Sequence, residues 1–468
     1  MLMNKIKKIL DPNDDYVYKE IKVLKISIYI IFSEVLTDSV YINDFILRRI
    51  INITNKSNLT NLQDILPDTT VFNIKEQDII KYLNTGFAVV IYKNIITAIE
   101  AKAHLDRGVA FADSELSIKG PKDAFSENFN TNLGLIKRRI KCSSLHRDTL
   151  FIGKHTNTKV GVLYISDIVD KSIVYEVNKK LNNIDIDGII DFTYLKSVLE
   201  SSQNNFFPTI ITTQRPDKAS SALLDGKVVI IVDMSPYVII LPNFFMDFFH
   251  PTDDYYQKAI NTSFIRILRL IAFLIAIFLP AYYIAITTHN QSAIATKLLL
   301  NLKAQQLLSP FPSFLEVILM TLSFEILKES DIRMSSTTGS AISILGGLIL
   351  GDALVSAGII SPIIIIIVAI SSISGLIFND IELVNAIRWE RLILIVLSTF
   401  LGMYGIYLGF ILLLINLVSL RSFQRSYLFP FSPFNKDSFK DSLIKINNLT
   451  LVKRNSLLTK NIIRGKYK

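Results

Sequence analysis

Side chains that could perform catalysis or bind a metal are few and scattered in this chain. The five histidines, at positions 104, 146, 155, 250 and 289, lack the spacing of metal ligands, and Cys142 is the single cysteine. One cysteine forms no intrachain disulfide and no cysteine metal cluster, which is typical of a reducing compartment. The sequence has no phosphate-binding loop, zinc-protease motif or serine-hydrolase motif. We therefore expect no enzyme: no catalytic residues, no metal and no cofactor.

Three carboxylates lie within apolar segments, where a charge needs water or a partner. Glu316 and Glu325 are nine residues apart, so an ideal helix places them on opposite sides, and we expect each to pair separately or to lie near an interface. Asp352 follows a ladder of small residues with a four-residue period: Gly339, Ser343, Gly347 and Gly351. Such a ladder indicates close helix packing, either within the chain or around the axis of a pore. Asp352 is the candidate side chain of a cation pathway, and Glu325 is a candidate for helix packing or for the pore.

The apolar segments account for the unusual composition. Hydrophobic residues make up 50% of the 468 residues and charged residues only 19%, which excludes intrinsic disorder. A membrane-spanning helix needs about 20 mostly apolar residues. The candidate segments are 270–286, 353–379 and 392–420, then 334–351, and more weakly 312–327. We therefore expect an α-helical multispan membrane domain over residues 251–420, with four to six helical segments.

The net charge is concentrated at the C-terminus. Residues 421–468 hold eleven Lys and Arg against two Asp, which accounts for the whole formal charge of +9. This pattern predicts a basic cytoplasmic tail facing anionic membrane lipids, and no nucleic-acid partner. Arg266 and Arg269 precede the first candidate span, so both ends of the chain are expected in the cytoplasm, which requires an even number of crossings. Either 312–327 does not cross fully, or 295–308 crosses as well.

Before the membrane domain, short β-branched runs alternate with helical patterns. Strands are expected at 23–32, 87–92, 149–155, 160–165, 228–232 and 238–241. Helices are expected at 40–50, 76–83, 125–140, 169–181 and 192–200. These elements predict a soluble α/β region of two lobes, residues 1–142 and 143–250, each of ordinary domain size.

The most specific pattern lies between residues 118 and 141. Gly120 and Pro121 indicate a turn that starts a helix, because Pro suits the first helical turn. An apolar stripe with helical period follows: Phe125, Phe129, Leu133, Ile136 and Ile140. Periodicity does not explain the polar residues of this segment, which are Glu127, Asn128 and Asn132. The pair Arg138 and Arg139 either caps the helix or contacts a neighbouring subunit.

Five blocks in this order resemble the spore germination protein A family, the A subunits of bacterial spore germinant receptors. The first block includes Lys119, Gly120, Pro121, Phe125, Glu127, Asn128, Asn132, Arg138 and Arg139. The second includes Arg215, Pro216, Asp217 and Gly226. The other three are residues 247–266 before the first span, 310–329 around Glu325, and 420–433 after the last span. Asp352 departs from the family pattern, which has an uncharged polar residue at this position.

The resemblance implies a receptor subunit in the inner membrane of the spore, with both terminal regions in the cytoplasm. It implies as partners a transporter-like B subunit, a lipoprotein C subunit and further A subunits around an ion-conducting pore that triggers germination on nutrient sensing. The alternative is a secondary transporter of a small solute or ion. Transporters often contain internal repeats, and none relates residues 264–330 to 331–420.

Overall fold

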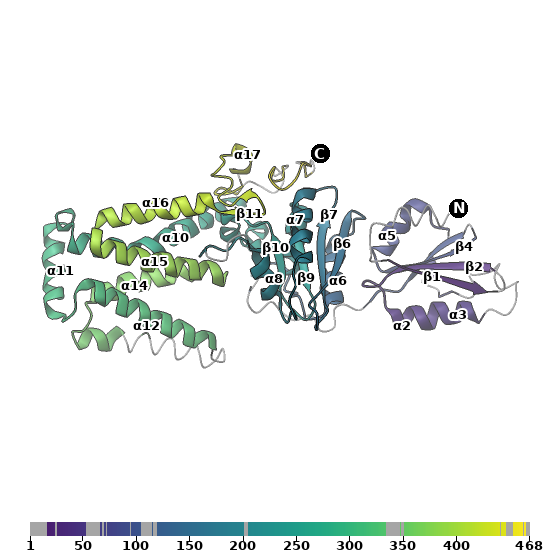
Figure 1. The fold of residues 1–468 in the computed structure, drawn as a ribbon, viewed down its shortest axis with the longest axis horizontal. Helices are drawn as coiled ribbons and strands as arrows, with labels where there is room; N and C mark the ends of the chain where they lie inside the picture. Colours follow the sequence, from purple (N-terminus) through teal and green to yellow (C-terminus); the bar gives the residue numbers. More distant parts are fainter. Residues whose placement is uncertain are drawn as a thin grey trace.

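The computed structural model describes residues 16–23, 26–52, 66–67, 70–71, 73–93, 95–103, 115, 119–200, 205–333, 347, 351–439, 441–445, 453–461 and 463–464. Two lobes that contain sheets and one helical part follow one another along the long axis of the molecule (Figure 1). The C-terminal segment lies over the place where the second lobe meets the helices.

The first lobe is a sheet between two helical layers. Its strands are β1 (Tyr16–Val23), β2 (Ile26–Ser33), β3 (Thr70–Val71), β4 (Phe87–Tyr92) and β5 (Ile95–Glu100), in the spatial order β1-β2-β4-β5-β3. Its helices are α2 (Ser39–Tyr41), η1 (Ile42–Leu47) and α3 (Arg48–Ile51) on one face, and η3 (Glu76–Asp78) and α5 (Ile79–Leu83) on the other. Val90 packs with the first layer and Val89 with the second, so β4 is apolar on both faces.

The second lobe repeats this layered plan. Its strands are β6 (Leu145–Ile152), β7 (Thr158–Ile165), β8 (Ile211–Thr213), β9 (Val228–Val232) and β10 (Val238–Leu241), in the order β6-β7-β9-β10-β8. One face carries α6 (Phe129–Arg139) and α9 (Pro216–Leu224), and the other α7 (Lys171–Asn182) and α8 (Phe192–Leu199). Although α6 precedes residue 142, the expected lobe boundary, it packs in the core of the second lobe.

The mixture of helices and strands is as predicted, but the strand pairing corrects the α/β assignment. All pairs in both sheets are antiparallel among the described strands. An α/β fold in the strict sense has parallel strands joined by crossover helices. Here β1–β2, β4–β5, β6–β7 and β9–β10 are hairpins, so each lobe is an antiparallel sheet covered by helices.

The C-terminal part is helical. It contains α10 (Ala259–Thr288), η6 (Gln291–Ala293), α11 (Thr296–Leu308), α12 (Ser313–Arg333), α14 (Pro362–Gly375), α15 (Ile381–Leu401) and α16 (Met403–Ser419). The long helix α10 contacts α12, α14, α15 and α16, so it is the centre of the bundle. A Cβ atom on Gly409 would clash with the Leu394 side chain, so this glycine allows α16 to pack closely on α15.

The described helices do not establish a multispan domain by length. Among the described residues, only α10, with 30 residues, is long and apolar enough to cross a membrane by itself. Helices α11 and α12 would supply a second span if the pair, bent by 74°, counted as one. The predicted segments 353–379 and 392–420 are interrupted at Gly358 and Gly402, which have φ values of 64° and 59°. The predicted segment 334–351 lies outside the described residues except for positions 347 and 351.

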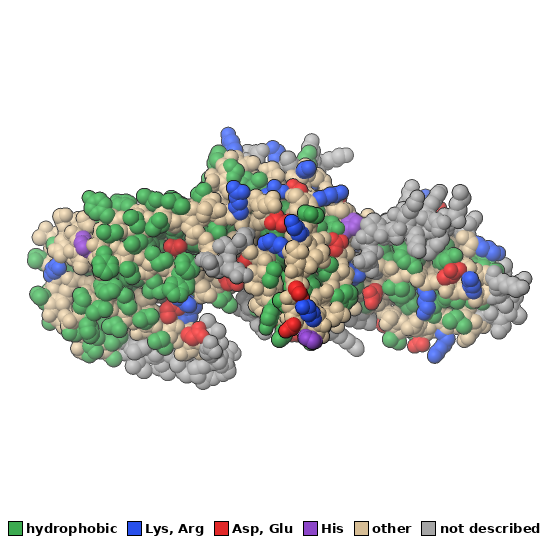
Figure 2. All heavy atoms as spheres, viewed as in Figure 1, with side chains coloured by type: hydrophobic (Ala, Val, Ile, Leu, Met, Phe, Trp, Pro, Cys, Tyr) green, Lys and Arg blue, Asp and Glu red, His purple; other side chains and the backbone are tan. Residues whose placement is uncertain are grey.

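The surface of the helical part is nevertheless strongly apolar. Figure 2 shows hydrophobic side chains over most of this part, whereas charged side chains gather on the lobes and the C-terminal segment. Phe400, Tyr404 and Ile415 are examples of large exposed side chains on α15 and α16. A contiguous exposed apolar surface of this kind is typical of membrane contact or of protein interfaces.

The C-terminal segment is folded onto the second lobe. It begins with β11 (Arg421–Ser422) and β12 (Arg425–Ser426) and contains α17 (Lys436–Phe439). The Ser422 hydroxyl accepts a hydrogen bond from the Asn243 backbone and donates one to Thr209, and Phe423 is buried in the lobe. Arg425 forms a 2.7 Å ion pair with Asp170. This segment therefore has protein partners, whereas the sequence predicted the anionic membrane surface as its partner.

Candidate coupling site between the second lobe and the helices

The family-like segment 118–141 holds α6 on the second sheet. Asn128 is the N-cap of α6, and its side chain accepts hydrogen bonds from the backbones of Asn130 and Thr131. Asn132 is fully buried, accepts from the Ser126 backbone at 2.7 Å and donates back to the Ser126 carbonyl at 2.6 Å. These bonds give the polar residues of the segment a structural role that periodicity does not reveal.

The start of the helix in this segment differs from the prediction. The helix begins at Phe129, eight residues after Pro121, because Asn128 provides the cap and residues 121–128 are not helical. The Glu127 carbonyl accepts a hydrogen bond from Met234, which joins this stretch to the β9–β10 turn. All five residues of the predicted apolar stripe, Phe125, Phe129, Leu133, Ile136 and Ile140, are buried.

The basic end of α6 meets acidic and aromatic groups. Arg139 forms a 2.6 Å ion pair with Asp123 and also donates to the Leu135 carbonyl at the helix end, whereas Arg138 is exposed. Lys119 and Pro121 are exposed as well. Lys137 lies over the ring of Tyr16 at 5.6 Å, so α6 also touches the first lobe.

The second family-like block forms a buried ion-pair cluster. Arg215 donates two hydrogen bonds to Asp217, at 3.1 and 2.7 Å, and a third to Asp253 at 3.1 Å. The Tyr256 hydroxyl donates to Asp217 at 2.8 Å. Burial alone would raise the pKa of Asp217, but the bonds and charge of Arg215 and the Tyr256 hydroxyl hold it below its usual 3.8. Pro216 starts α9, and Gly226 ends the following turn at φ +91°.

Beside this cluster lies a second one, here called the charged junction: Asp254, Arg266, Arg269, Asp441 and Lys445. The Asp254 carboxylate accepts from Arg266 at 3.1 Å and from Arg269 at 2.9 and 3.0 Å. Arg266 also bonds the carbonyl and carboxylate of Asp441, and Lys445 donates to the Asp254 carbonyl at 2.6 Å. The charged junction therefore ties the end of the second lobe, the start of α10 and the C-terminal segment together.

A cluster of aromatic rings continues the junction into the helical part. Phe245 and Phe249 follow β10, Phe273 lies on α10, and Phe378 precedes α15. Ring centroids are 5.1 Å apart for Phe245 and Phe249, 5.6 Å for Phe249 and Phe273, and 5.3 Å for Phe249 and Phe378. These rings belong to one apolar core that runs from α6 and α9 to α10, α15 and α16. The second lobe is thus packed directly against the helices, and a motion of the lobe acts on them.

Within the helical part, the two glutamates have different partners, as the helical geometry predicted. Glu325 forms ion pairs with Arg388 at 2.7 Å and Arg391 at 2.9 Å, both on α15. Glu316 is fully buried and accepts from the Ser361 backbone at 2.8 Å. Glu325 thus connects α12 to α15, and Arg391 extends the network to Ser371 on α14 at 3.4 Å.

The small-residue ladder is described only in part. Gly339 and Ser343 lie outside the described residues. A Cβ atom placed on Gly347 or Gly351 would have no described neighbour within 4 Å, and Asp352 is exposed. The described end of the ladder is therefore not packed against the described part of its own chain.

The histidines and the cysteine take separate positions. His146 stacks on Tyr164, His289 bonds the Thr399 carbonyl, and Cys142 is exposed, while His104 lies outside the described residues. In the part of the chain that the structure describes, no three His, Cys, Asp or Glu side chains are grouped as metal ligands.

Comparison with known proteins identifies the family. The family model described as "GerA: Bacillus/Clostridium GerA spore germination protein" matches residues 4–457. The chain belongs to this family. It is 38% identical over 340 residues to spore germination protein KA of Bacillus subtilis, covering 73% of this chain and 62% of that protein. It is 32% identical over 445 residues to spore germination protein GerQA of Bacillus cereus, covering 94% and 89%.

A solved structure also matches this GerA-family chain. It is the N-terminal domain of the A subunit of the Bacillus megaterium spore germinant receptor GerK3, with 29% identity and a TM-score of 0.40. The match covers 52% of this chain and 94% of that domain. The family model and the two curated relatives confirm, at the level of the family, the resemblance found in the sequence.

Removing the charge of Asp254 should destabilise the protein strongly. In Asp254→Asn, Arg266 and Arg269 stay buried without their shared carboxylate, which costs about 3 kcal/mol. The thermal unfolding midpoint of the purified protein in detergent should fall. Asp185→Asn is the control, because the ion pair of Asp185 with Lys154 is largely exposed and should leave the midpoint unchanged. Equal midpoints for the two variants would contradict this assignment.

His250 should make stability depend on pH. Burial, then the charges of Arg266, Arg269 and Lys227, hold the pKa of His250 well below 6.5, although the Ser442 carbonyl raises it. The folded state thus keeps the imidazole neutral, while the unfolded chain takes up a proton below about pH 6.5. Stability from this group is lost as the pH falls from 7.5 to 5.5, by up to about 1.4 kcal/mol per pH unit.

The measurement compares the wild type with His250→Gln in thermal unfolding at both pH values. The comparison is needed because burial and Glu382 raise the pKa of Glu200 to about 7, which makes the folded state gain stability as the pH falls. Both proteins share this effect of Glu200, so the wild type should lose more stability than the variant. Identical pH profiles would refute the role of His250.

Proposed function

We propose that this chain is the A subunit of a nutrient germinant receptor in the inner membrane of the spore. A transporter-like B subunit and a lipoprotein C subunit are its partners, and both terminal regions face the cytoplasm. Membership of the GerA family over residues 4–457 supports this function. The absence of a catalytic motif from the sequence favours a receptor subunit over an enzyme.

The observation that carries the mechanism is the continuous core between the second lobe and the helices. Phe245 and Phe249 of the lobe pack on Phe273 of α10, and the charged junction surrounds the first turns of that helix. Close-packed cores switch between discrete arrangements rather than deforming smoothly. A displacement of the second lobe, produced by a partner subunit that has bound a nutrient, would therefore move α10 and the helices on it.

The helical part is proposed to form an ion-conducting pore as an oligomer in the membrane. Its exposed apolar surface and the 30-residue helix α10 support contact with lipid. Gly347 and Gly351 have no described neighbour that a Cβ would touch, which supports packing of this face against another copy of the chain. Asp352 is the next residue after Gly351, is exposed, and is proposed to line the cation pathway.

Deletion of the gene tests the receptor function. Spores without this chain should release no K⁺ and no dipicolinate in response to the nutrient that this receptor detects. Restoring the wild-type gene should restore the release, and deleting the other germinant receptors in the same strain removes redundancy. Normal release for every nutrient in that strain would overturn the proposal.

The pore is tested through Asp352. In planar bilayers that hold the purified oligomer, Asp352→Asn should lower cation conductance and cation selectivity, because the pore loses its ring of negative charge. In spores of the same strain, the variant should slow the release of K⁺ for the same reason. Asp380→Asn is unsuitable as a control, because Asp380 caps α15. Glu329→Gln, on the same helical part, serves instead. Equal conductance and selectivity in wild type and Asp352→Asn would eliminate this role of Asp352.

A further inference from the structure

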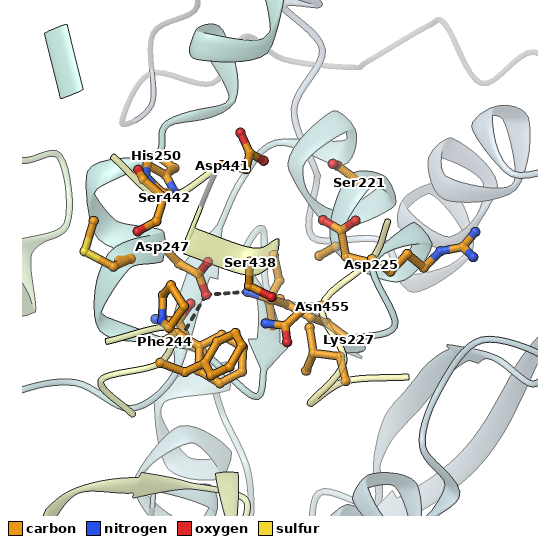
Figure 3. Close-up of a pocket in the computed structure, with 18 of the residues that line it drawn as sticks. Ser221, Asp225, Lys227, Phe244, Asp247, His250, Ser438, Asp441, Ser442 and Asn455 are labelled. Atoms are coloured by element: carbon orange, nitrogen blue, oxygen red, sulfur yellow. Dashed lines mark hydrogen bonds and ion pairs between the residues drawn. The ribbon is translucent and has the colours of Figure 1, made fainter. Parts of the chain in front are cut away.

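A cavity of about 420 Å³ lies between the second lobe and the C-terminal segment (Figure 3). Its walls come from α9 and the strand ends of the lobe on one side, and from residues 429–430, 438, 441–442, 453–455, 458 and 464 on the other. His250 and Ser442 lie together at one end in the close-up and Asp225 at the other, with Asp247 and Ser438 between them. The volume is in the range of pockets that hold small organic molecules.

Two buried polar side chains lining this cavity have no hydrogen-bond partner among the described residues. Asn243 is 0% exposed, and neither the nitrogen nor the oxygen of its carboxamide is bonded. The hydroxyl of Ser442, which is 3% exposed, has no partner either. A buried amide left unpaired costs about 1–3 kcal/mol, so proteins rarely keep one without use. A carboxamide offers both a donor and an acceptor, which suits a polar group that presents both.

The charges around the cavity favour an anion. Five Lys and Arg line it, against three Asp. Two of the acidic groups are neutralised, Asp247 by Lys227 at 2.6 Å and Asp225 by Arg464. The third, Asp441, is paired with Arg266 of the charged junction. Arg454 bonds only main-chain carbonyls, those of Leu224, Asn461 and Ile463, and has no ion pair with a described carboxylate.

The apolar walls suit a flat organic group. Phe244 and Phe429 line the cavity with ring centroids 5.8 Å apart, and both are buried. Asn243 is the fully buried polar group of the lining, whereas Arg454 is partly exposed and Lys453 exposed. The cavity thus has a buried polar and aromatic part and a basic rim.

We propose that this cavity binds a small organic phosphate of about the size of a mononucleotide. The carboxamide of Asn243 and the hydroxyl of Ser442 bind the polar edge of the organic group beside Phe244. Arg454, with Lys453 at the rim, binds the phosphate through charge-assisted hydrogen bonds. Because one wall belongs to the C-terminal segment, the bound molecule fastens that segment to the lobe, next to the charged junction at Asp441.

The test is calorimetric titration of the purified full-length protein in detergent with adenosine 5′-monophosphate, ribose 5-phosphate and inorganic phosphate. Binding should be saturable and tightest for the mononucleotide, which reaches both parts of the cavity. Arg454→Gln should weaken mononucleotide binding at least tenfold, the loss expected for one charged hydrogen bond. Lys436→Gln is the matched control, since it removes the same charge from an exposed position in the same segment outside the cavity lining.

Asn243→Leu separates a binding role from a structural one. This change keeps a similar volume and removes an unpaired buried amide, so the unfolding midpoint should stay the same or rise while mononucleotide affinity falls at least tenfold. A lower midpoint with unchanged affinity would overturn the assignment. The proposal also fails if no organic phosphate binds at millimolar concentration, or if Lys436→Gln weakens binding as much as Arg454→Gln.

The phosphate could also belong to a lipid headgroup, and a second titration distinguishes the two sources. Vesicles of phosphatidylcholine with and without phosphatidylglycerol are added to the protein before the mononucleotide. Competition by phosphatidylglycerol alone, lost in Arg454→Gln, would assign the same site to a lipid headgroup. Mononucleotide binding that is unaffected by either vesicle assigns the site to a soluble metabolite. In that case, bound mononucleotide should slow the cleavage of the C-terminal segment by trypsin.

Discussion

The structure depends on one buried carboxylate, Asp254, held between Arg266 and Arg269. Removing three charged groups from water is costly, and the cost is offset only because the carboxylate accepts three charge-assisted hydrogen bonds at 2.9 to 3.1 Å. This requirement fixes where α10 begins relative to the second lobe. It also fixes the C-terminal segment, because Arg266 needs Asp441 as its second partner. Three parts of the chain that are distant in sequence are thereby held at one point.

The aromatic cluster fixes the orientation of the second lobe relative to α10. Ion pairs alone would tether the lobe to α10 without defining an orientation, since charged side chains are long and adjustable. The rings of Phe249, Phe273 and Phe378 meet edge to face, and close-packed rings of this kind allow few alternative arrangements. The same core reaches α16 through Leu413 and Leu417. A displacement of the second lobe is therefore either resisted by the packed helices or transmitted to all of them.

Local patterns predicted those parts of the fold that local interactions determine. β4, β9 and β10 have the predicted bounds because their β-branched runs are buried on both faces, and the stripe of α6 is buried as its period required. β3 and β8, with two and three residues, are too short to show any period. Asn128 carried the signal of a helix cap, yet the preceding Gly-Pro turn suggested an earlier start. The charged junction had no local signal, because Asp254 and Asp441 are far apart in sequence and meet only through Arg266.

The number of charged residues in the sequence differs from the charge that stays unpaired once the chain is folded. In the sequence, Arg266 and Arg269 are two positive charges beside a predicted span, and positive charges at such positions orient helices in a membrane. In the fold they are paired with Asp254 and Asp441, so little of their charge remains uncompensated. Arg425 and Arg464 of the basic tail are likewise paired with acidic groups of the second lobe. The charge that remains available is carried by residues such as Lys436, which is exposed, and Arg454, whose partners are carbonyls rather than carboxylates. The tail is therefore first of all a part of the second lobe.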